Sequence, residues 1–156
     1  SKDMHRGEEF YSLSKIGPYT FSKYIVAARD NTKFCSTVIE PILTPWGEKK
    51  QSICVKHTMI IGRDMNGRFI TKDEAHFING ILNSSIVIEY MQNTFKSNGY
   101  SLKKSRFYLP LFDKNNILHQ QICKLSKKAS SSVKAAEIEE IQHRLSDLYI
   151  KMCELR

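Results

Sequence analysis

Three residues of the chain have the types and the order that metal-dependent nucleases use. Asp30 is followed by Glu48 and Lys50, which imitates the array in which carboxylates hold Mg²⁺ and a lysine assists the attacking water. One acidic residue and a later Glu-x-Lys also occur together by chance in many charged chains. A nuclease built on these three residues is therefore a third interpretation, behind the two that follow.

Other catalytic and metal-binding patterns are weaker. Residues 64–73 resemble a calcium loop, but the first acidic ligand falls on Gly62. The five histidines lack metal-ligand spacing, and the sequence nominates no Ser-His-Asp arrangement. Four widely spaced cysteines with apolar neighbours indicate reduced, buried thiols, and these are Cys35, Cys54, Cys123 and Cys153. We expect no catalytic residue, metal site or cofactor in this chain.

Basic residues interleaved with aromatic and amide side chains suit a different chemistry, contact with nucleic acid. Arginine and lysine bind guanine or phosphate, whereas asparagine and glutamine bind adenine. Any single basic residue is more often a solvated surface group, but we expect one or two of four such groups to touch DNA. The candidate DNA-binding residues are Tyr19, Lys23, Tyr24, Arg29 and Lys33; Lys49, Lys50 and Gln51; Lys56, His57, Arg63 and Arg68; and Lys103, Lys104 and Arg106.

Length, charge and hydropathy narrow the class of protein. A chain of 156 residues has room for one core and no second catalytic domain. Its net charge of +8, concentrated in the first two thirds, favours a polyanionic partner. No apolar run approaches the ~20 residues of a membrane span. The chain opens without an initiating methionine or a signal-like segment, so we expect a piece of a longer, cytoplasmic protein.

The residue pattern in the first two thirds of the chain predicts a β-sheet. Aromatic and β-branched residues around a Gly-Pro turn indicate strands within residues 10–26. Residues 34–43 and 52–61 are β-rich, and the segment between them carries proline, glycine and charge, which predicts a hairpin with a basic tip. Asn66-Gly67 is typical of a tight turn.

Helices are predicted after this turn. Thr71 and Glu74 have the capping-box spacing, so a helix should begin near Lys72. Residues 83–85 offer a break and a new cap for a second helix that reaches residues 90–95, giving a bent pair. Residues 107–111 read as extended.

A helical pattern returns at Asn115, is interrupted at residues 130–132 and continues to the end of the chain. The last helix carries apolar residues three and four apart from Ile138 to Leu155, which form a narrow seam. We interpret the seam as packing antiparallel on the preceding helix, although it could also dock another domain or protomer.

Four blocks of sequence resemble, in the same order, the DNA-recognition half of a known enzyme family. Residues 10–21 contain Gly-Pro-Tyr-Thr-Phe, residues 55–61 look like an internal strand, and residues 74–85 carry the most specific signature, a helix and its break. Residues 108–129 resemble the exit strand and the following helix. The family is that of N6-adenine DNA methyltransferases of type IIG and type I restriction-modification systems. The likeness covers residues 10–129 and departs at residues 23–28, where the family's Pro-Tyr-Lys-Val and tryptophan are replaced.

The resemblance implies a target-recognition domain in residues 1–112 and a helical tail in residues 113–156. Methyl transfer in this family needs an Asn-Pro-Pro-Tyr motif and a glycine-rich turn for S-adenosylmethionine, and the sequence contains neither. The target base must leave the duplex stack, so its pocket belongs to a separate catalytic domain. The chain would therefore bind double-stranded DNA and orient it without reacting, whether or not the parent enzyme also cuts DNA.

We expect an α+β fold: a small twisted β-sheet with a bent helix pair and a C-terminal helical hairpin. The expected function is sequence-specific recognition of double-stranded DNA for a bacterial restriction-modification adenine methyltransferase. The alternative is a protein-interaction or oligomerisation module of a restriction complex, with self-association through the C-terminal helices. Salt separates the two, because phosphate contacts weaken steeply with added salt and an apolar seam does not.

Overall fold

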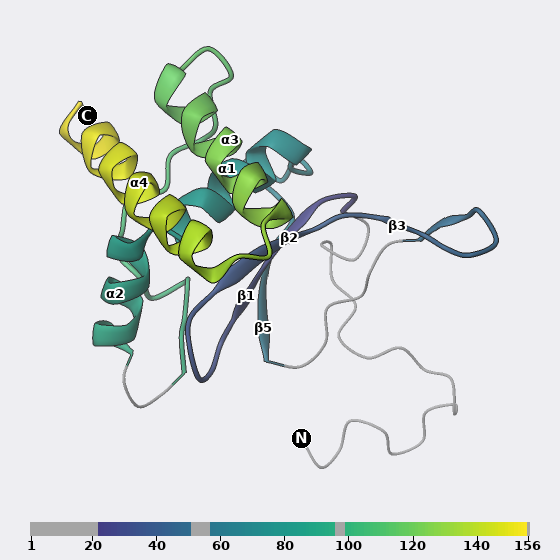
Figure 1. The fold of residues 1–156 in the computed structure, drawn as a ribbon, viewed down its shortest axis with the longest axis horizontal. Helices are drawn as coiled ribbons and strands as arrows, with labels where there is room; N and C mark the ends of the chain where they lie inside the picture. Colours follow the sequence, from purple (N-terminus) through teal and green to yellow (C-terminus); the bar gives the residue numbers. More distant parts are fainter. Residues whose placement is uncertain (1–21, 51–56, 96–98, 156) are drawn as a thin grey trace.

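Four helices gather beside a small antiparallel sheet, as the expected α+β class requires (Figure 1). This computed structural model describes residues 22–50, 57–95 and 99–155. No helix within these ranges combines the length and the apolar character that a bilayer span needs. The sheet and the helices share one core.

The main sheet has three strands with β1 (Ile25–Arg29) in the middle. Strands β2 (Ser36–Ile39) and β5 (Thr58–Ile61) flank it, and both run antiparallel to it. Four successive β1 residues, Ile25 to Ala28, are buried, which is typical of a central strand covered on both faces.

Beyond the sheet, β3 (Ile42–Leu43) and β4 (Lys49–Lys50) pair as a two-stranded hairpin that projects from the body (Figure 1). We call residues 42–50 the ribbon. The ribbon confirms the predicted turn between residues 44 and 50, but the predicted pairing of residues 34–43 with 52–61 is wrong, because β2 and β5 each pair with β1. Residues 51–56 lie outside the described residues. Pro41, which has no N–H to donate, ends β2 and separates it from β3.

The helices follow the predicted pattern closely. The bent pair is α1 (Lys72–Leu82) and α2 (Ser85–Thr94), and the C-terminal hairpin is α3 (Ile117–Ser131) and α4 (Ala135–Glu154). The capping box at α1 is confirmed: the Glu74 N–H donates to Thr71 Oγ1 at 3.3 Å, and the Thr71 N–H donates to Glu74 Oε2 at 2.6 Å.

The core joins the sheet to all four helices. Buried residues of one hydrophobic cluster come from the sheet region, α1, α2, α3 and α4, and include Val26, Phe34, Phe77, Ile81, Met91, Ile122 and Leu145. The α4 seam is part of this cluster, since Ile141, Leu145 and Met152 are all buried. The expectation that the seam packs within the chain is confirmed.

Buried amides connect α1 to its two neighbours. The Asn79 amide donates to Ser126 Oγ of α3 at 3.0 Å, and Ser36 Oγ of β2 donates to Asn79 Oδ1 at 2.9 Å. Asn83 completes the link, because its Oδ1 accepts from the Ser36 N–H at 3.1 Å and its Nδ2 donates to the Ser36 carbonyl at 2.8 Å. Paired in this way, buried polar groups fix one register between helix and strand.

The expectation of buried cysteines holds only in part. Cys123 is buried and Cys153 is half-buried, but Cys35 is exposed, and Cys54 lies outside the described residues. Phe34 is completely buried, and successive side chains of an extended segment point in opposite directions, so Cys35 faces outward. All three described cysteines are free thiols.

Gly80 gives the first testable prediction, because α1 and α3 touch at this residue. A Cβ here would lie 2.6 Å from Ile122 Cγ2 and 3.1 Å from the Ile122 carbonyl oxygen. Helix propensity alone predicts that Gly80→Ala stabilises the chain by about 1 kcal/mol. We expect the opposite, a loss of about 1–3 kcal/mol in the free energy of unfolding, since Ile122 is fully buried and both its side chain and its backbone oxygen would have to move. Urea denaturation measures the difference, and a gain in stability would contradict the close contact.

His119 makes stability depend on pH. It is buried, and its Nδ1 accepts the Asp113 N–H at 3.0 Å, which requires a neutral ring. Desolvation lowers the pKa of His119 from its ordinary 6.5, while the nearby Asp113 charge opposes the shift. The unfolded chain therefore binds the proton more readily, and the free energy of unfolding falls as pH drops below 6.5.

The expected slope from this group is at most about 1.4 kcal/mol per pH unit. Urea unfolding at about pH 7 and about pH 5 measures it. His119→Gln removes the titrating ring and should flatten this part of the acid loss. An unchanged slope in the variant would show that other groups cause it.

Candidate nucleic-acid interface

Antiparallel pairing gives the three-stranded sheet two distinct ends. Ile25 pairs with Ile39 and Val26 pairs with Ile61, so the start of β1 lies beside the ends of β2 and β5. At this end β2 continues into the ribbon (Figure 1), and we call it the ribbon end. The candidate DNA-binding residues that come from it are Lys23, Lys49, Lys50, Arg63 and Arg68.

The ribbon is short but well ordered by hydrogen bonds. The Thr44 N–H donates to the Glu48 carbonyl at 2.8 Å, and the Gly47 N–H donates to the Thr44 carbonyl at 2.9 Å. The Thr44 hydroxyl bridges the same turn, donating to the Glu48 carbonyl and accepting from the Glu48 N–H, both at 3.0 Å. Lys49 and Lys50 lie in β4 directly after this turn rather than at the predicted tip.

Glu40 fixes the base of the ribbon to α1. Its Oε1 and Oε2 both lie 2.8 Å from Lys72 Nζ, and its Oε1 is 3.6 Å from His76 Nε2. The hydrogen bond from Lys72 lowers the pKa of Glu40, although partial burial opposes the shift. Because Glu40 directly precedes Pro41 and the ribbon, this ion pair helps to set the direction in which the ribbon projects.

Three cation–aromatic pairs occur at the ribbon end. Lys23 Nζ lies 5.4 Å from the centre of the Tyr24 ring. Lys50 Nζ lies 5.3 Å from the Trp46 ring, and the Arg63 guanidinium lies 4.5 Å from the Phe69 ring. Such pairs present a flat apolar ring next to a positive charge, the combination that contacts both bases and phosphates.

The loop after β5 is a second, smaller hairpin. Arg63 pairs with Phe69 across an isolated β-bridge, and the predicted Asn-Gly turn is confirmed by the Gly67 N–H bond to the Asp64 carbonyl at 3.0 Å. Desolvation raises the pKa of Asp64, but hydrogen bonds from the Arg68 backbone and side chain lower it more. Arg68 Nη2 lies 2.7 Å from Asp64 Oδ2, so its charge is already partnered, whereas the Arg63 side chain extends outward.

The opposite end of the sheet, which we call the turn end, holds a second basic set. Backbone bonds converge on Asp30 there: its N–H donates to the His57 carbonyl at 3.2 Å, and its carbonyl accepts from the Tyr100 N–H at 2.7 Å. His57 Nδ1 also lies 3.4 Å from Asp30 Oδ1. His57 and Thr32 have φ of 65° and 58°, which is uncommon for residues with a side chain. The candidate residues near the turn end are Arg29, Lys33, His57, Lys103 and Lys104.

The remaining candidates fall in neither set. Tyr24 is half-buried and packs against the core, so one side of its ring serves the fold. Arg106 lies beside α2, because its N–H donates to the Tyr90 hydroxyl at 2.9 Å. Three candidates lie outside the described residues, namely Tyr19, Gln51 and Lys56.

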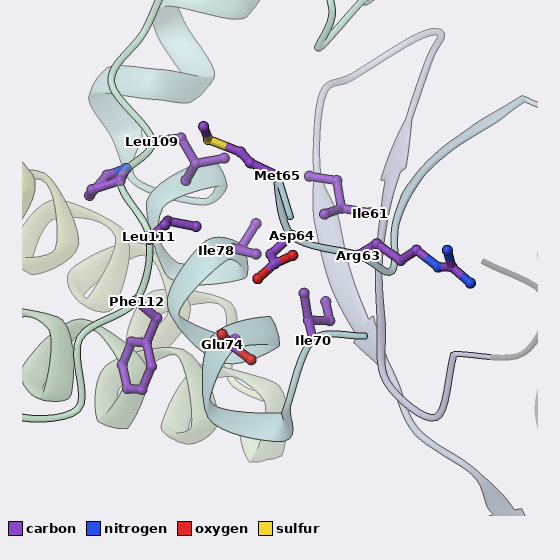
Figure 2. Close-up of a pocket in the computed structure, with 11 residues that line it drawn as sticks. Ile61, Arg63, Asp64, Met65, Ile70, Glu74, Ile78, Leu109, Leu111 and Phe112 are labelled. Atoms are coloured by element: carbon purple, nitrogen blue, oxygen red, sulfur yellow. The ribbon is translucent and has the colours of Figure 1, made fainter. Parts of the chain in front are cut away.

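An apolar pocket of about 100 Å³ lies beside the ribbon end, between the loop after β5, α1 and residues 109–112. Figure 2 shows Met65 lying over it near Leu109 while Arg63 points away. The two carboxylates that line the pocket already have partners. Asp64 forms an ion pair with Arg68, and Glu74 takes part in the N-terminal cap of α1. This pocket therefore offers apolar surface and no set of free catalytic groups.

The structure separates the nuclease-like residues. Asp30 belongs to the turn end, whereas Glu48 and Lys50 belong to the ribbon beyond the other end of the sheet. Glu48 is instead occupied locally, with Lys50 Nζ 3.6 Å away and the Trp46 indole donating at 3.1 Å. No group of three or more potential metal ligands occurs among the described residues.

A line of three polar side chains, which the sequence analysis did not identify, runs from Ser126 through His76 to Glu40. Ser126 Oγ lies 3.3 Å from His76 Nδ1, and His76 Nε2 lies 3.6 Å from Glu40 Oε1. Burial lowers the pKa of His76, and the nearby Lys127 and Lys72 act in the same direction. Ser126 is almost completely buried and already accepts the Asn79 amide, so these groups join α3, α1 and β2.

Sequence reasoning also missed the exposed apolar residues of the ribbon. Ile42 is 57% exposed, and Leu43 and Trp46 are each 67% exposed. The β-rich pattern of residues 34–43 had placed Ile42 and Leu43 in a strand, and the segment that contains Trp46 was expected to be a hairpin tip. The sequence does contain a signal for this exposure. Pro41 and Gly47 are so close in the sequence that the hairpin has room for only two residue pairs, and no other described element covers it.

No protein-family model, curated protein or solved structure matched the chain.

Trp46 gives a direct test of the projecting ribbon, because it is the chain's only tryptophan. With its side chain exposed, its native fluorescence should be red-shifted, and acrylamide should quench it nearly as well as in the urea-unfolded chain. Free N-acetyltryptophanamide serves as the fully exposed control. Blue-shifted, shielded emission that persists on dilution would mean that the ribbon folds against the body.

Proposed function

We propose that this chain is a sequence-specific double-stranded DNA recognition domain, non-catalytic by itself, of a bacterial restriction-modification adenine methyltransferase. The observation that carries the proposal is the ribbon, a hydrogen-bonded two-stranded projection with exposed apolar and basic side chains. The family is proposed from the four sequence blocks described at the start. DNA binding is proposed from the geometry and charge of the described residues.

The dimensions of the ribbon suit the major groove. Paired strands lie about 4.8 Å apart. A two-stranded β-ribbon with its side chains fits a groove about 12 Å wide, whereas the minor groove is about 6 Å wide. Lys49 and Lys50 are exposed and leave from opposite faces of β4. The contact of Lys50 with Glu48 is long, at 3.6 Å, and lies in solvent, so it competes weakly and each lysine can reach a different phosphate backbone. The hydrogen-bonded turn holds this shape before DNA arrives, which lowers the entropy lost on binding.

The ribbon end enlarges the proposed contact. Lys23 and Arg63 are exposed, and each lies over an aromatic ring. Lys23 precedes β1 and Arg63 follows β5, so both lie at the end of the sheet from which the ribbon leaves. Charged groups of this kind supply affinity without sequence information, because they neutralise phosphates and release counterions. Exposed Arg29 and Lys33 at the turn end are candidates for a further stretch of backbone.

Catalysis is assigned to another domain of the parent protein. The carboxylates nearest the ribbon end, Glu74, Asp64 and Glu40, are engaged in a helix cap and in ion pairs. S-adenosylmethionine and the extruded adenine would be held by that partner domain. A restriction-modification system acts on DNA inside the bacterial cell, so the proposed location is the cytoplasm.

The alternative, assembly through the C-terminal helices, has less support. The residues that were to form its docking seam include Ile141, Leu145 and Met152, and these are buried within the chain. Helix α4 packs against α3 and α2. Its exposed outer face carries charged residues such as Glu139, Glu140 and Arg144. Exposed apolar side chains remain at the ends of these helices, namely Ile117, Val133 and Leu155, but they are isolated positions, whereas those of the ribbon, Ile42, Leu43 and Trp46, lie within one short hairpin.

Charge reversal on the ribbon tests the proposal. Fluorescence anisotropy with a duplex pool of randomised sequence should show binding whose log Kd varies linearly with log salt concentration. Lys49→Glu with Lys50→Glu should weaken binding by at least about tenfold and reduce the slope by about two, one per phosphate contact.

The matched control is Lys124→Glu with Lys151→Glu, which changes the net charge equally on the exposed surfaces of α3 and α4. This control should retain most of the affinity and the slope. Equal loss in both variants would contradict an interface at the ribbon, because it would reflect net charge alone.

A further inference from the structure

Lysine charges account for attraction to phosphate but leave the apolar groups of the ribbon unexplained. Ile42 pairs with Lys50, and Leu43 pairs with Lys49. Directly paired residues share a face, and successive residues alternate, so each face of the ribbon carries one aliphatic side chain beside one lysine. Both aliphatic side chains are more than half exposed.

This arrangement differs from that of a strand that packs on its own protein. A packing strand has one apolar face and one polar face, whereas the ribbon has the same mixture on both. Two equivalent faces suit a partner that surrounds the ribbon, as the two walls of a groove do. The lysines give the charge complementarity that a polyanionic groove requires.

Within the major groove, one apolar group is available to the aliphatic side chains. Thymine presents its C5-methyl group there, while cytosine, adenine and guanine present hydrogen-bonding groups without a methyl. The side chains of Ile42 and Leu43 cannot donate or accept hydrogen bonds, so they gain free energy by removing apolar surface from water, and the thymine methyl is the largest apolar group on a base edge.

We propose that Ile42 and Leu43 read thymine methyl groups in the major groove, so that the recognised sequence contains thymine at the positions facing the ribbon. This inference rests on the proposed DNA-binding function and adds the base class that the ribbon distinguishes. Lys49 and Lys50 hold the phosphates on either side, and the aliphatic pair supplies the discrimination.

The experiment replaces each thymine by deoxyuridine, which lacks only the C5-methyl group. Duplexes that the intact chain retains from the randomised pool define the preferred site. Each thymine of that site is then replaced singly, and Kd is measured by anisotropy. At one or two positions the loss of the methyl should weaken binding about fourfold, the value of one methyl group buried from water.

Protein variants assign the effect to the ribbon. Ile42→Ala and Leu43→Ala should weaken binding to the thymine duplex and abolish the difference between thymine and deoxyuridine at the matching position. Both side chains are exposed, so the variants should keep the wild-type thermal unfolding curve. Ile150→Ala, at an exposed apolar position on α4, is the control and should preserve the fourfold difference.

The two proposals fail in different ways. If the chain binds duplexes through Lys49 and Lys50 but no thymine position responds to deoxyuridine, methyl recognition is overturned and the DNA-binding function stands. Methyl recognition is also overturned if the difference between thymine and deoxyuridine survives in both alanine variants. It is overturned as well if Ile42→Ala removes a bend in the duplex and leaves the methyl preference, because Ile42 would then act as a wedge between base steps. If no salt-dependent duplex binding is found, the proposed function itself is overturned.

Discussion

The contact of helix α1 with β2 on one side and α3 on the other holds the rest of the structure in place. Its buried residues Phe77 and Ile81 join the core, and Gly80 allows the Ile122 backbone to approach. Polar bonds give this packing a unique register, since Asn79 binds groups on both β2 and α3. Apolar packing alone tolerates a slide along the helix axis, but a buried amide without its partner is costly.

The same helix determines where the ribbon points. Strand β2 is fixed to α1 through Ser36, and four residues later Glu40 binds Lys72 at the first turn of α1. The ribbon then leaves the sheet at Pro41 with little support of its own. A hairpin with only two residue pairs would be marginally stable in isolation. Its direction and order therefore depend on the anchored residues at its base and on the hydrogen-bonded turn at its tip.

Local chemistry could be predicted from the sequence, and long-range pairing could not. The capping box at Thr71 and the Asn66-Gly67 turn depend on residues within a few positions of each other, and both are present in the structure. The pairing of β1 with β5 joins segments that lie far apart in the sequence, so the expected pairing of residues 34–43 with 52–61 was wrong, although the turn at residues 44–48 lies where the hairpin tip was expected. For the same reason, Lys23 and Arg63 belong to different basic groups in the sequence but to one end of the sheet. Trp46 lies in the expected turn segment, and the structure shows that no other described element covers its side chain.

The ribbon contributes little to folding, because its apolar side chains are largely in contact with water already. Substitutions at Ile42, Leu43 or Trp46 consequently leave the free energy of the core almost untouched, unlike substitutions at Ile122 or Leu145. A lineage carrying this scaffold can vary these surface positions freely while every descendant still folds. Divergence would then accumulate at the tip of the molecule, and the buried helices would stay alike.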